Sequence, residues 1–312
     1  QASVLLRKDL IIMMFAADMR PVAEEVALLA RGRVVLHEVL WNKFPDGFPD
    51  LFIENVKDVR YHHCCYLASL SSPSSLFEQI SVMHSLARYG PKSFTIVVPY
   101  YPTGTHERIT RMGQVATAAT LARLMSSTPP AASGCTALTI FDIHALQELF
   151  YFTDNVLVRL KSCISLLKAE LARMGPVSIA FPDEGALKRF KPKFEDFPLI
   201  VCEKRRDGET RRVTIKEGDC VGRTVVIVDD LVQSGGTLLS CANAVKEAGA
   251  ASVSAFCTHG VFPLESWRKF VDGPLETFFI TNTIPSSVKV LPSPPFRVLS
   301  IAPTVLSALS PY

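Results

Sequence analysis

Short apolar runs alternate along the chain with longer segments in which apolar residues recur every three or four positions. Glycine, proline and polar residues bound the short runs, which is typical of strands. The clearest predicted strands are residues 93–98, 137–143, 177–182, 199–204, 224–230 and 252–258. The predicted helices are residues 114–126, 155–174 and 238–248. Strands separated by helix-length segments indicate βαβ units, so the pattern predicts an α/β fold with a central, mostly parallel sheet flanked by helices.

Acidic residues stand at the ends of two predicted strands, one in each half of the chain. Asp142 and His144 close a strand in the first half, two positions apart and therefore expected on one face of it. Asp229 and Asp230 close a strand in the second half. Because ligands of open α/β sheets bind beyond the carboxyl ends of the strands, each half is predicted to present acidic groups at a binding site.

The length of 312 residues suits two domains, which we expect at 1–152 and 153–312. Hydrophobic residues make up 48% and charged residues 20%, which is enough apolar material for two cores. The net charge of +3 does not favour nucleic acid. No apolar run approaches the roughly 20 residues that span a bilayer. We therefore expect neither nucleic acid nor a membrane as a partner.

The eight cysteines show no CxxC pair and no zinc-finger spacing. Most lie in apolar runs, as Cys257 does. The histidine and cysteine pairs at 62–65 would point to opposite faces of an extended run, so we interpret them as structural. Because disulfides persist mainly in oxidising compartments, reduced core thiols predict an intracellular, cytoplasmic chain.

The most informative local pattern is VVIVDDLVQSGGT at 225–237, a predicted strand that leads into two carboxylates, a loop of small residues and a helix. Small residues let backbone N–H groups approach a phosphate, and the start of a helix adds donors and a partial positive charge. Carboxylates suit sugar hydroxyls. The pattern indicates a sugar-phosphate site, whereas the alternative is a plain strand–turn–helix corner with Thr237 as a cap. Neither a Walker P-loop nor a GxGxxG motif occurs.

This loop resembles the diphosphoribose-binding motif that phosphoribosyltransferases share with ribose-phosphate pyrophosphokinases. Further segments resemble the pyrophosphokinases in order along the chain: FPDG (44–47), VVPYYPTGTHER (97–108), FDIHALQ (141–147), FPDEGALKR (181–189), CEKRR (202–206), THGVF (258–262) and TNTIP (281–285). The resemblance is strongest to the plant-type second class. It implies two similar domains of the type I phosphoribosyltransferase fold. It also implies a homo-oligomer that transfers the diphosphoryl group of ATP to the C1 hydroxyl of ribose 5-phosphate, giving 5-phosphoribosyl 1-diphosphate and AMP.

The resemblance also implies roles for individual residues. It gives catalytic roles to Lys204 and Arg206. It implies ribose 5-phosphate binding by Asp229, Asp230, Ser234, Gly235, Gly236 and Thr237. It implies ATP binding by Phe44, Asp46, His106, Arg108 and His144. It implies Mg²⁺ binding by Asp142, His144 and Asp183. Because Mg²⁺ prefers oxygen ligands, we expect His144 to contact the metal weakly or to contact phosphate.

Two alternatives stay open at the level of the sequence. A phosphoribosyltransferase would use the same loop to consume the diphosphate product. A non-catalytic regulatory subunit of a synthase would keep the fold and lose the metal and lysine positions, but His144, Asp183 and Lys204 are all present.

Overall fold

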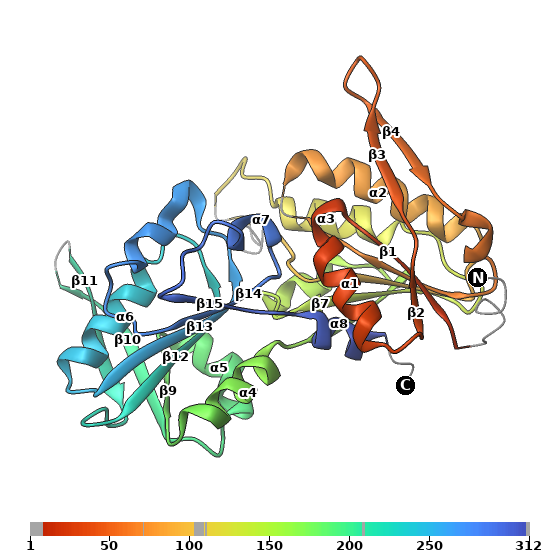
Figure 1. The fold of residues 1–312 in the computed structure, drawn as a ribbon. Helices are drawn as coiled ribbons and strands as arrows, with labels where there is room; N and C mark the ends of the chain where they lie inside the picture. Colours follow the sequence, from red (N-terminus) through yellow and green to blue (C-terminus); the bar gives the residue numbers. More distant parts are fainter. Residues whose placement is uncertain (1–8, 71, 103–108, 110, 208–209, 310–312) are drawn as a thin grey trace. The chain divides into compact units, whose positions relative to one another are not determined.

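The computed structural model describes residues 9–70, 72–102, 109, 111–207 and 210–309, with the side chains of 204–207 and 210–212 left out (Figure 1). The chain forms two compact units. The first comprises Gln1–Ser162 together with Ile301–Tyr312, and the second comprises Cys163–Ser300. The sequence-based boundary at 152/153 falls ten residues earlier, and the structure assigns residues after 300 to the first unit.

The first unit is built on a six-stranded parallel sheet in the order β2-β1-β5-β6-β7-β8. Its strands are β1 (Ile11–Phe15), β2 (Val34–Leu36), β5 (His63–Leu67), β6 (Ser93–Val98), β7 (Thr136–Phe141) and β8 (Val156–Lys161). Its helices are α1 (Arg20–Leu29), α2 (Pro73–Arg88), α3 (Thr117–Ser126) and α8 (Ala302–Ala308), with 3-10 turns η1 (Ala17–Met19), η2 (Val56–Val59) and η3 (Leu146–Tyr151). A hairpin of β3 (Val39–Lys43) and β4 (Pro49–Ile53) projects from the unit (Figure 1).

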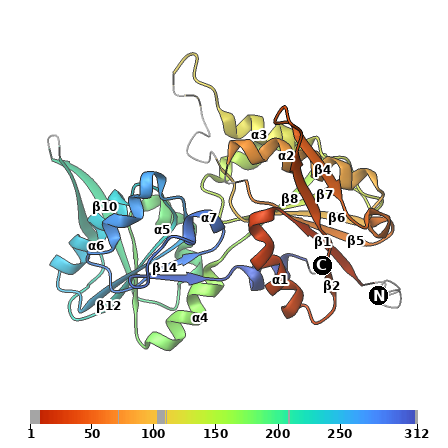
Figure 2. The ribbon, with the colours of Figure 1, turned by 45° about the horizontal axis from the view of Figure 1, so that its top comes forward.

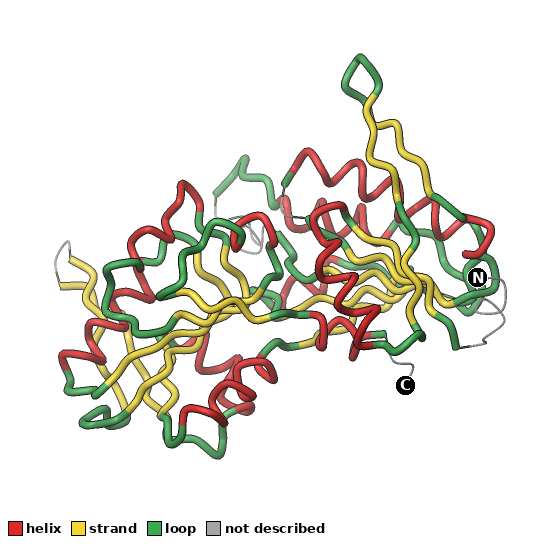
Figure 3. The backbone as a smooth tube through the Cα atoms, viewed as in Figure 1, coloured by secondary structure: helices red, strands yellow, loops and turns green. Residues whose placement is uncertain are grey.

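The second unit is built on a sheet whose strands Figure 3 draws in yellow. Its seven strands have the order β11-β10-β9-β12-β13-β14-β15 and are parallel except for the β10–β11 pair. Its strands are β9 (Ser178–Phe181), β10 (Leu199–Asp207), β11 (Thr210–Glu217), β12 (Thr224–Val232), β13 (Ser252–Gly260), β14 (Phe278–Thr281) and β15 (Phe296–Leu299). Its helices are α4 (Ile164–Met174), α5 (Glu184–Phe190), α6 (Gly236–Glu247) and α7 (Pro285–Val288), with 3-10 turns η4 (Lys191–Lys193) and η5 (Pro263–Phe270).

Several strands carry continuous apolar runs rather than alternating apolar and polar residues, so both faces of each sheet are covered. All five residues of β1 and all four of β9 and β14 are buried. Strands that are buried on both faces read as continuous apolar runs, as in other parallel sheets. In the second unit, α6 packs on the sheet through Leu238, Cys241, Ala242 and Val245, which recur every three or four residues (Figure 2).

Each sheet has one point at which the strand order reverses. In the first unit the chain passes from β1 to β2 on one side and later returns to β5 on the other. In the second unit it passes from β9 to β10 and β11, then returns to β12 on the other side of β9. Open α/β sheets commonly bind ligands at such a reversal, so a site is expected at the carboxyl ends of β9 and β12.

One element prediction is wrong. The predicted helix at 155–174 begins with β8, which pairs in parallel with β7, and only Ile164–Met174 is helical. Short apolar runs fit both periodicities, and sequence alone does not separate them. The predicted α/β class with mostly parallel sheets is confirmed.

Candidate active site at the end of the second sheet

Two adjacent carboxylates stand near the end of β12, beside the reversal point. Asp230 is buried and forms an ion pair with Arg189 of α5, while its backbone N–H donates to Oδ1 of Asp229 at 2.9 Å. Burial raises the pKa of Asp229 well above its ordinary value, and the negative charges of Asp230 and then Asp183 add to the shift. The structure thus brings three predicted site residues of the second unit together.

Asp183 follows β9 and begins α5. Its Oδ1 accepts hydrogen bonds from the backbone N–H groups of Gly185 and Ala186, both at 3.1 Å. This is an N-cap, which satisfies donors that the first helical turn leaves open. The same side chain therefore fixes the start of α5 and adds negative charge at the end of the sheet.

The predicted phosphate loop, residues 233–237, runs from the end of β12 into α6, which begins at Gly236. Gly235 is the N-cap of α6 with φ +78°, a left-handed conformation that favours glycine. A Cβ there would lie 2.5 Å and 2.6 Å from ring atoms of Phe270. Gly236 has open space instead, since a Cβ would find only Ser234 Oγ, at 4.0 Å. No side-chain cap occurs at the start of α6, and N–H groups of a first helical turn without such a cap are suited to an anion.

Residues 11–128 match the family described as the N-terminal domain of ribose phosphate pyrophosphokinase, and residues 205–310 match the family described as the phosphoribosyl synthetase-associated domain. A protein of Oryza sativa subsp. japonica, ribose-phosphate pyrophosphokinase 3, chloroplastic, is 48% identical over 96% of this chain and 76% of its own length. The chain belongs to the ribose-phosphate pyrophosphokinase family.

Other relatives agree. Ribose-phosphate pyrophosphokinase 4 of the same plant is 47% identical and covers 92% of both chains. A ribose-phosphate pyrophosphokinase of Ureaplasma parvum is 27% identical over 98% of this chain and 92% of its own. The crystal structure of phosphoribosylpyrophosphate synthetase from Mycobacterium smegmatis has the same fold, with a TM-score of 0.80 at 23% identity, over 96% of this chain and 97% of that one. The predicted family, its plant-type second class, the fold class and the enzyme activity are confirmed.

Other predicted site residues lie on a neighbouring strand or outside the described residues. Lys204 and Arg206 belong to β10, the strand beside β9, opposite Val213 and Arg211 of β11. Their side chains are not described. The predicted ATP residues His106 and Arg108 lie outside the described residues. The ion-pair partner of Asp230, Arg189, was not predicted. A buried carboxylate is commonly stabilised by a paired cation, but the sequence does not identify which one.

In the first unit, Phe44 and Asp46 occupy the turn of the β3–β4 hairpin. Phe44 is 51% exposed, and Oδ1 of Asp46 accepts a hydrogen bond from the backbone N–H of Phe48 at 3.0 Å. The backbone N–H of Phe44 donates to the carbonyl of Phe48 at 2.8 Å, and Gly47 has φ +88°. The carboxylate therefore stabilises the turn that presents the aromatic ring.

The expectation that Asp142 and His144 share one strand face is wrong. β7 ends at Phe141, and Asp142 has φ +36°, so the alternation of an extended strand stops there. Asp142 is buried, with its backbone N–H donating to the carbonyl of Lys161 at 2.9 Å, whereas His144 is exposed. These two residues belong to the first unit and Asp183 to the second. Within the described residues, no three histidine, cysteine or acidic groups gather closely enough to hold a metal ion.

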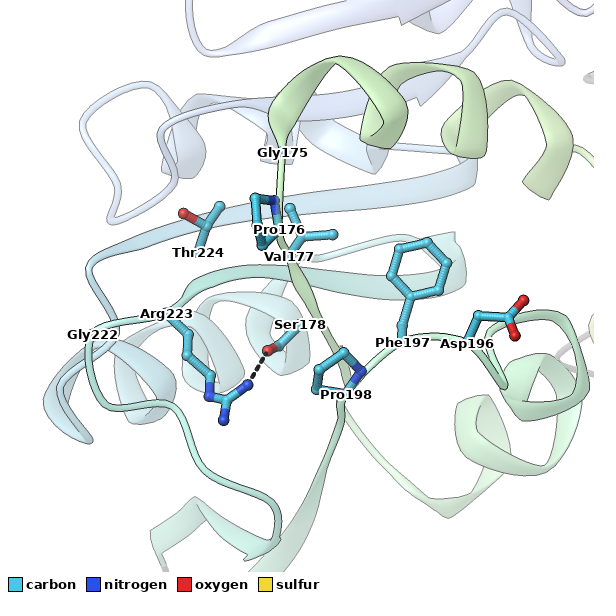
Figure 4. A pocket seen from close by; sticks show the side chains of 10 residues that line it. All are labelled: Gly175, Pro176, Val177, Ser178, Asp196, Phe197, Pro198, Gly222, Arg223 and Thr224. Atoms are coloured by element: carbon cyan, nitrogen blue, oxygen red, sulfur yellow. Dashed lines mark hydrogen bonds between the residues drawn. The ribbon is translucent and has the colours of Figure 1, made fainter.

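A cavity of about 520 Å³ lies at the opposite end of the second sheet (Figure 4). Residues that precede β9, β10 and β12 line it, and Arg223 reaches across it to within 3.5 Å of Ser178 Oγ. No predicted site residue lines this cavity. Cavity volume therefore does not identify the predicted substrate site. Phosphate binding uses backbone N–H groups at the surface of a loop and needs no deep pocket.

Proposed function

We propose that the carboxyl end of the second sheet binds ribose 5-phosphate. Ser234, Gly235, Gly236 and Thr237 hold the 5-phosphate at the start of α6, and the carboxylates of Asp229 and Asp230 accept hydrogen bonds from the ribose hydroxyls. The observation that carries this proposal is the acidic pair at the end of β12, directly before a glycine-capped helix at the reversal point of the strand order.

The family's reaction joins this sugar phosphate to ATP. The C1 hydroxyl of ribose 5-phosphate attacks the β-phosphorus of ATP, the diphosphoryl group moves to C1, and AMP leaves. Transfer of this kind asks the protein mainly for positioning and charge stabilisation. We assign the neutralisation of charge on the transferring group to Lys204 and Arg206, on the strand beside β9. We assign ATP binding to Phe44, Asp46, His106, Arg108 and His144.

The acidic groups fit a role for Mg²⁺. Burial, and then the negative charges of Asp230 and Asp183, disfavour ionised Asp229 and raise its pKa, and a nearby cation offsets that cost. Mg²⁺ commonly takes one or two protein carboxylates and completes its shell with water and substrate phosphate oxygens. We propose that Asp183 contacts one ion beside the ribose, and that Asp142 and His144 of the first unit contact a separate ion on ATP. The bound ion would neutralise charge on the ATP phosphates.

The remaining expectations concern partners and location. ATP and ribose 5-phosphate are the proposed small-molecule partners, and nucleic acid and membrane are not expected. Among the described residues no helix is long and apolar enough to cross a bilayer. A homo-oligomer and a cytoplasmic location remain predictions. The rice relative above is named chloroplastic and a spinach relative mitochondrial, so a fluorescent fusion protein is the direct test of location.

The test of the ribose 5-phosphate site separates its two ends. Wild-type protein is titrated by calorimetry with ribose 5-phosphate and with inorganic phosphate, and its turnover is followed as AMP formed from ATP, Mg²⁺ and ribose 5-phosphate. We expect Asp229→Asn to weaken the binding of ribose 5-phosphate and to leave phosphate binding unchanged. Equal weakening of both ligands, or no weakening, would contradict the assignment.

A further inference from the structure

Three side chains of one short segment contact the back of the phosphate loop. Ser266 Oγ donates to the carbonyl oxygen of Gln233 at 2.6 Å, and Lys269 Nζ donates to the carbonyl oxygen of Ser234 at 3.1 Å. The ring of Phe270 occupies the space beside Gly235. Positions 266, 269 and 270 have the spacing of one helical face, so η5 presents all three contacts to the loop together.

These contacts orient the donors of the loop. A trans peptide unit is planar, and its carbonyl oxygen points opposite to the N–H group of the next residue. When the carbonyls of Gln233 and Ser234 are fixed toward η5, the N–H groups of Ser234 and Gly235 must point away from it. Successive N–H groups that point to one side of a turn form an anion-binding concavity, and here they adjoin the first turn of α6.

The segment is anchored firmly enough to act as a support. Phe262, just before η5, is buried, and its ring contacts Phe270 with a centroid separation of 6.1 Å in an edge-to-face arrangement. Phe270 is itself fully buried, and its ring contacts those of Phe278 and Phe296 at centroid separations of 5.0 Å and 6.1 Å. The backbone of η5 is therefore held from the core side while its outer face meets the loop.

We propose that Ser266 and Lys269 are positioning residues that hold the phosphate loop in its anion-binding conformation before ribose 5-phosphate arrives. The inference rests on the proposed ribose 5-phosphate site and assigns it two residues that do not touch the substrate. Holding the loop in advance removes the cost of ordering it on binding. Losing this preordering weakens the binding of the substrate and of the transition state equally. The KM for ribose 5-phosphate therefore rises, and kcat does not change.

The decisive variant is Lys269→Met, which keeps the length of the side chain and removes the donor. We expect it to raise the KM and the Kd for ribose 5-phosphate roughly three- to fivefold, because the hydrogen bond is charge-assisted but exposed, and to leave kcat and the KM for ATP within about twofold. Lys269→Arg should restore most of the affinity. Ser266→Ala should weaken ribose 5-phosphate binding in the same direction and by less.

The matched control is Arg268→Met. Arg268 is the neighbouring cation on the same segment, but it pairs with Glu265, Nη2 to Oε2 at 2.9 Å, on the exposed side. Removing it changes the net charge by the same amount and leaves the loop contacts in place. Equal effects of Lys269→Met and Arg268→Met, or an unchanged affinity in Lys269→Met, would overturn the positioning role.

The design also separates the two proposals. Wild-type protein that does not bind ribose 5-phosphate overturns the proposed site and the positioning role together, whereas normal binding by both wild type and Lys269→Met overturns the positioning role alone. If the melting temperature of Lys269→Met is much lower than that of wild type, Ser266→Ala is used in its place, because it removes only a single oxygen atom. Amide hydrogen exchange of residues 234–237 should then be faster in Ser266→Ala than in wild type, and equal exchange with equal affinity would overturn the role.

Discussion

The guanidinium of Arg189 is paired with the carboxylate of Asp230, and this pair makes the two adjacent aspartates unequal. Asp230 is nearly inaccessible to solvent and has a cation beside it. Asp229 is half-buried, and the charge of Asp230 helps to raise its pKa. Asp230 therefore has a paired cation, whereas burial and the neighbouring negative charges disfavour the ionised form of Asp229 and raise its pKa.

Arg189→Met should destabilise the fold, because it leaves the buried carboxylate of Asp230 without its cation. Breaking such a pair costs about 3 kcal/mol in the free energy of unfolding. Urea unfolding of the free protein measures it. Arg268→Met, which breaks the exposed pair with Glu265, should cost less than about 1 kcal/mol. The double variant Arg189→Met with Asp230→Asn should recover part of the loss, and no recovery would mean that Arg189 acts through packing alone.

The stability of the free protein should depend on pH through Asp229. Its pKa in the folded protein is raised above the ordinary value of 3.8. The favoured protonated form is fully present below pH 3.8 and is lost as the pH rises through the folded pKa, so this contribution to stability falls with rising pH. Asp229→Asn lacks the titrating group. As the pH rises above 4, the melting temperature of Asp229→Asn should increase relative to that of wild type. If the two plots of melting temperature against pH run parallel, the raised pKa of Asp229 is refuted.

The two glycines of the loop should respond differently to alanine. Gly235→Ala adds a Cβ against Phe270 in a left-handed conformation, so it should lower the free energy of unfolding by about 1–3 kcal/mol. Gly236→Ala meets open space and should leave the fold intact or slightly stabilised. It should still weaken ribose 5-phosphate binding, because the new methyl group stands at the proposed phosphate position. Thermal melting and calorimetry measure the two effects separately. Equal melting temperatures for the two variants would contradict the loop geometry.

Lys204→Ala should lower kcat by roughly 10²–10³ and change ribose 5-phosphate affinity little, as expected for a group that stabilises developing charge. AMP formation at saturating substrates is the measurement. Lys216→Ala is a suitable control, since Lys216 lies on β11 and pairs with exposed Glu184, Nζ to Oε1 at 3.0 Å. A Lys204→Ala enzyme within a few-fold of wild type would remove Lys204 from the reaction.

The sequence predicted what is local and missed what depends on distant contacts. The strand, acidic pair, loop and helix from β12 to α6 follow one another directly, so residue types alone predicted them. Arg189 and Lys269 meet the same stretch from 41 and 35 residues away. No short pattern encodes such pairs, because either residue could equally lie in solvent. The shared face of Asp142 and His144 failed for a local reason, since one left-handed residue ends the alternation.

The assignment of α8 to the first unit has a consequence for folding. Ile301, Ala302 and Val305 are buried in the unit that begins the chain, where α8 packs on α1. The second unit is thus an insertion between two segments of the first. All strands of the inserted unit lie before residue 301, whereas the first unit needs both α8 and its earlier segment to complete its core. Because domains generally fold as units, the unit with the proposed ribose 5-phosphate site should be able to complete its fold without α8, and the first unit should not.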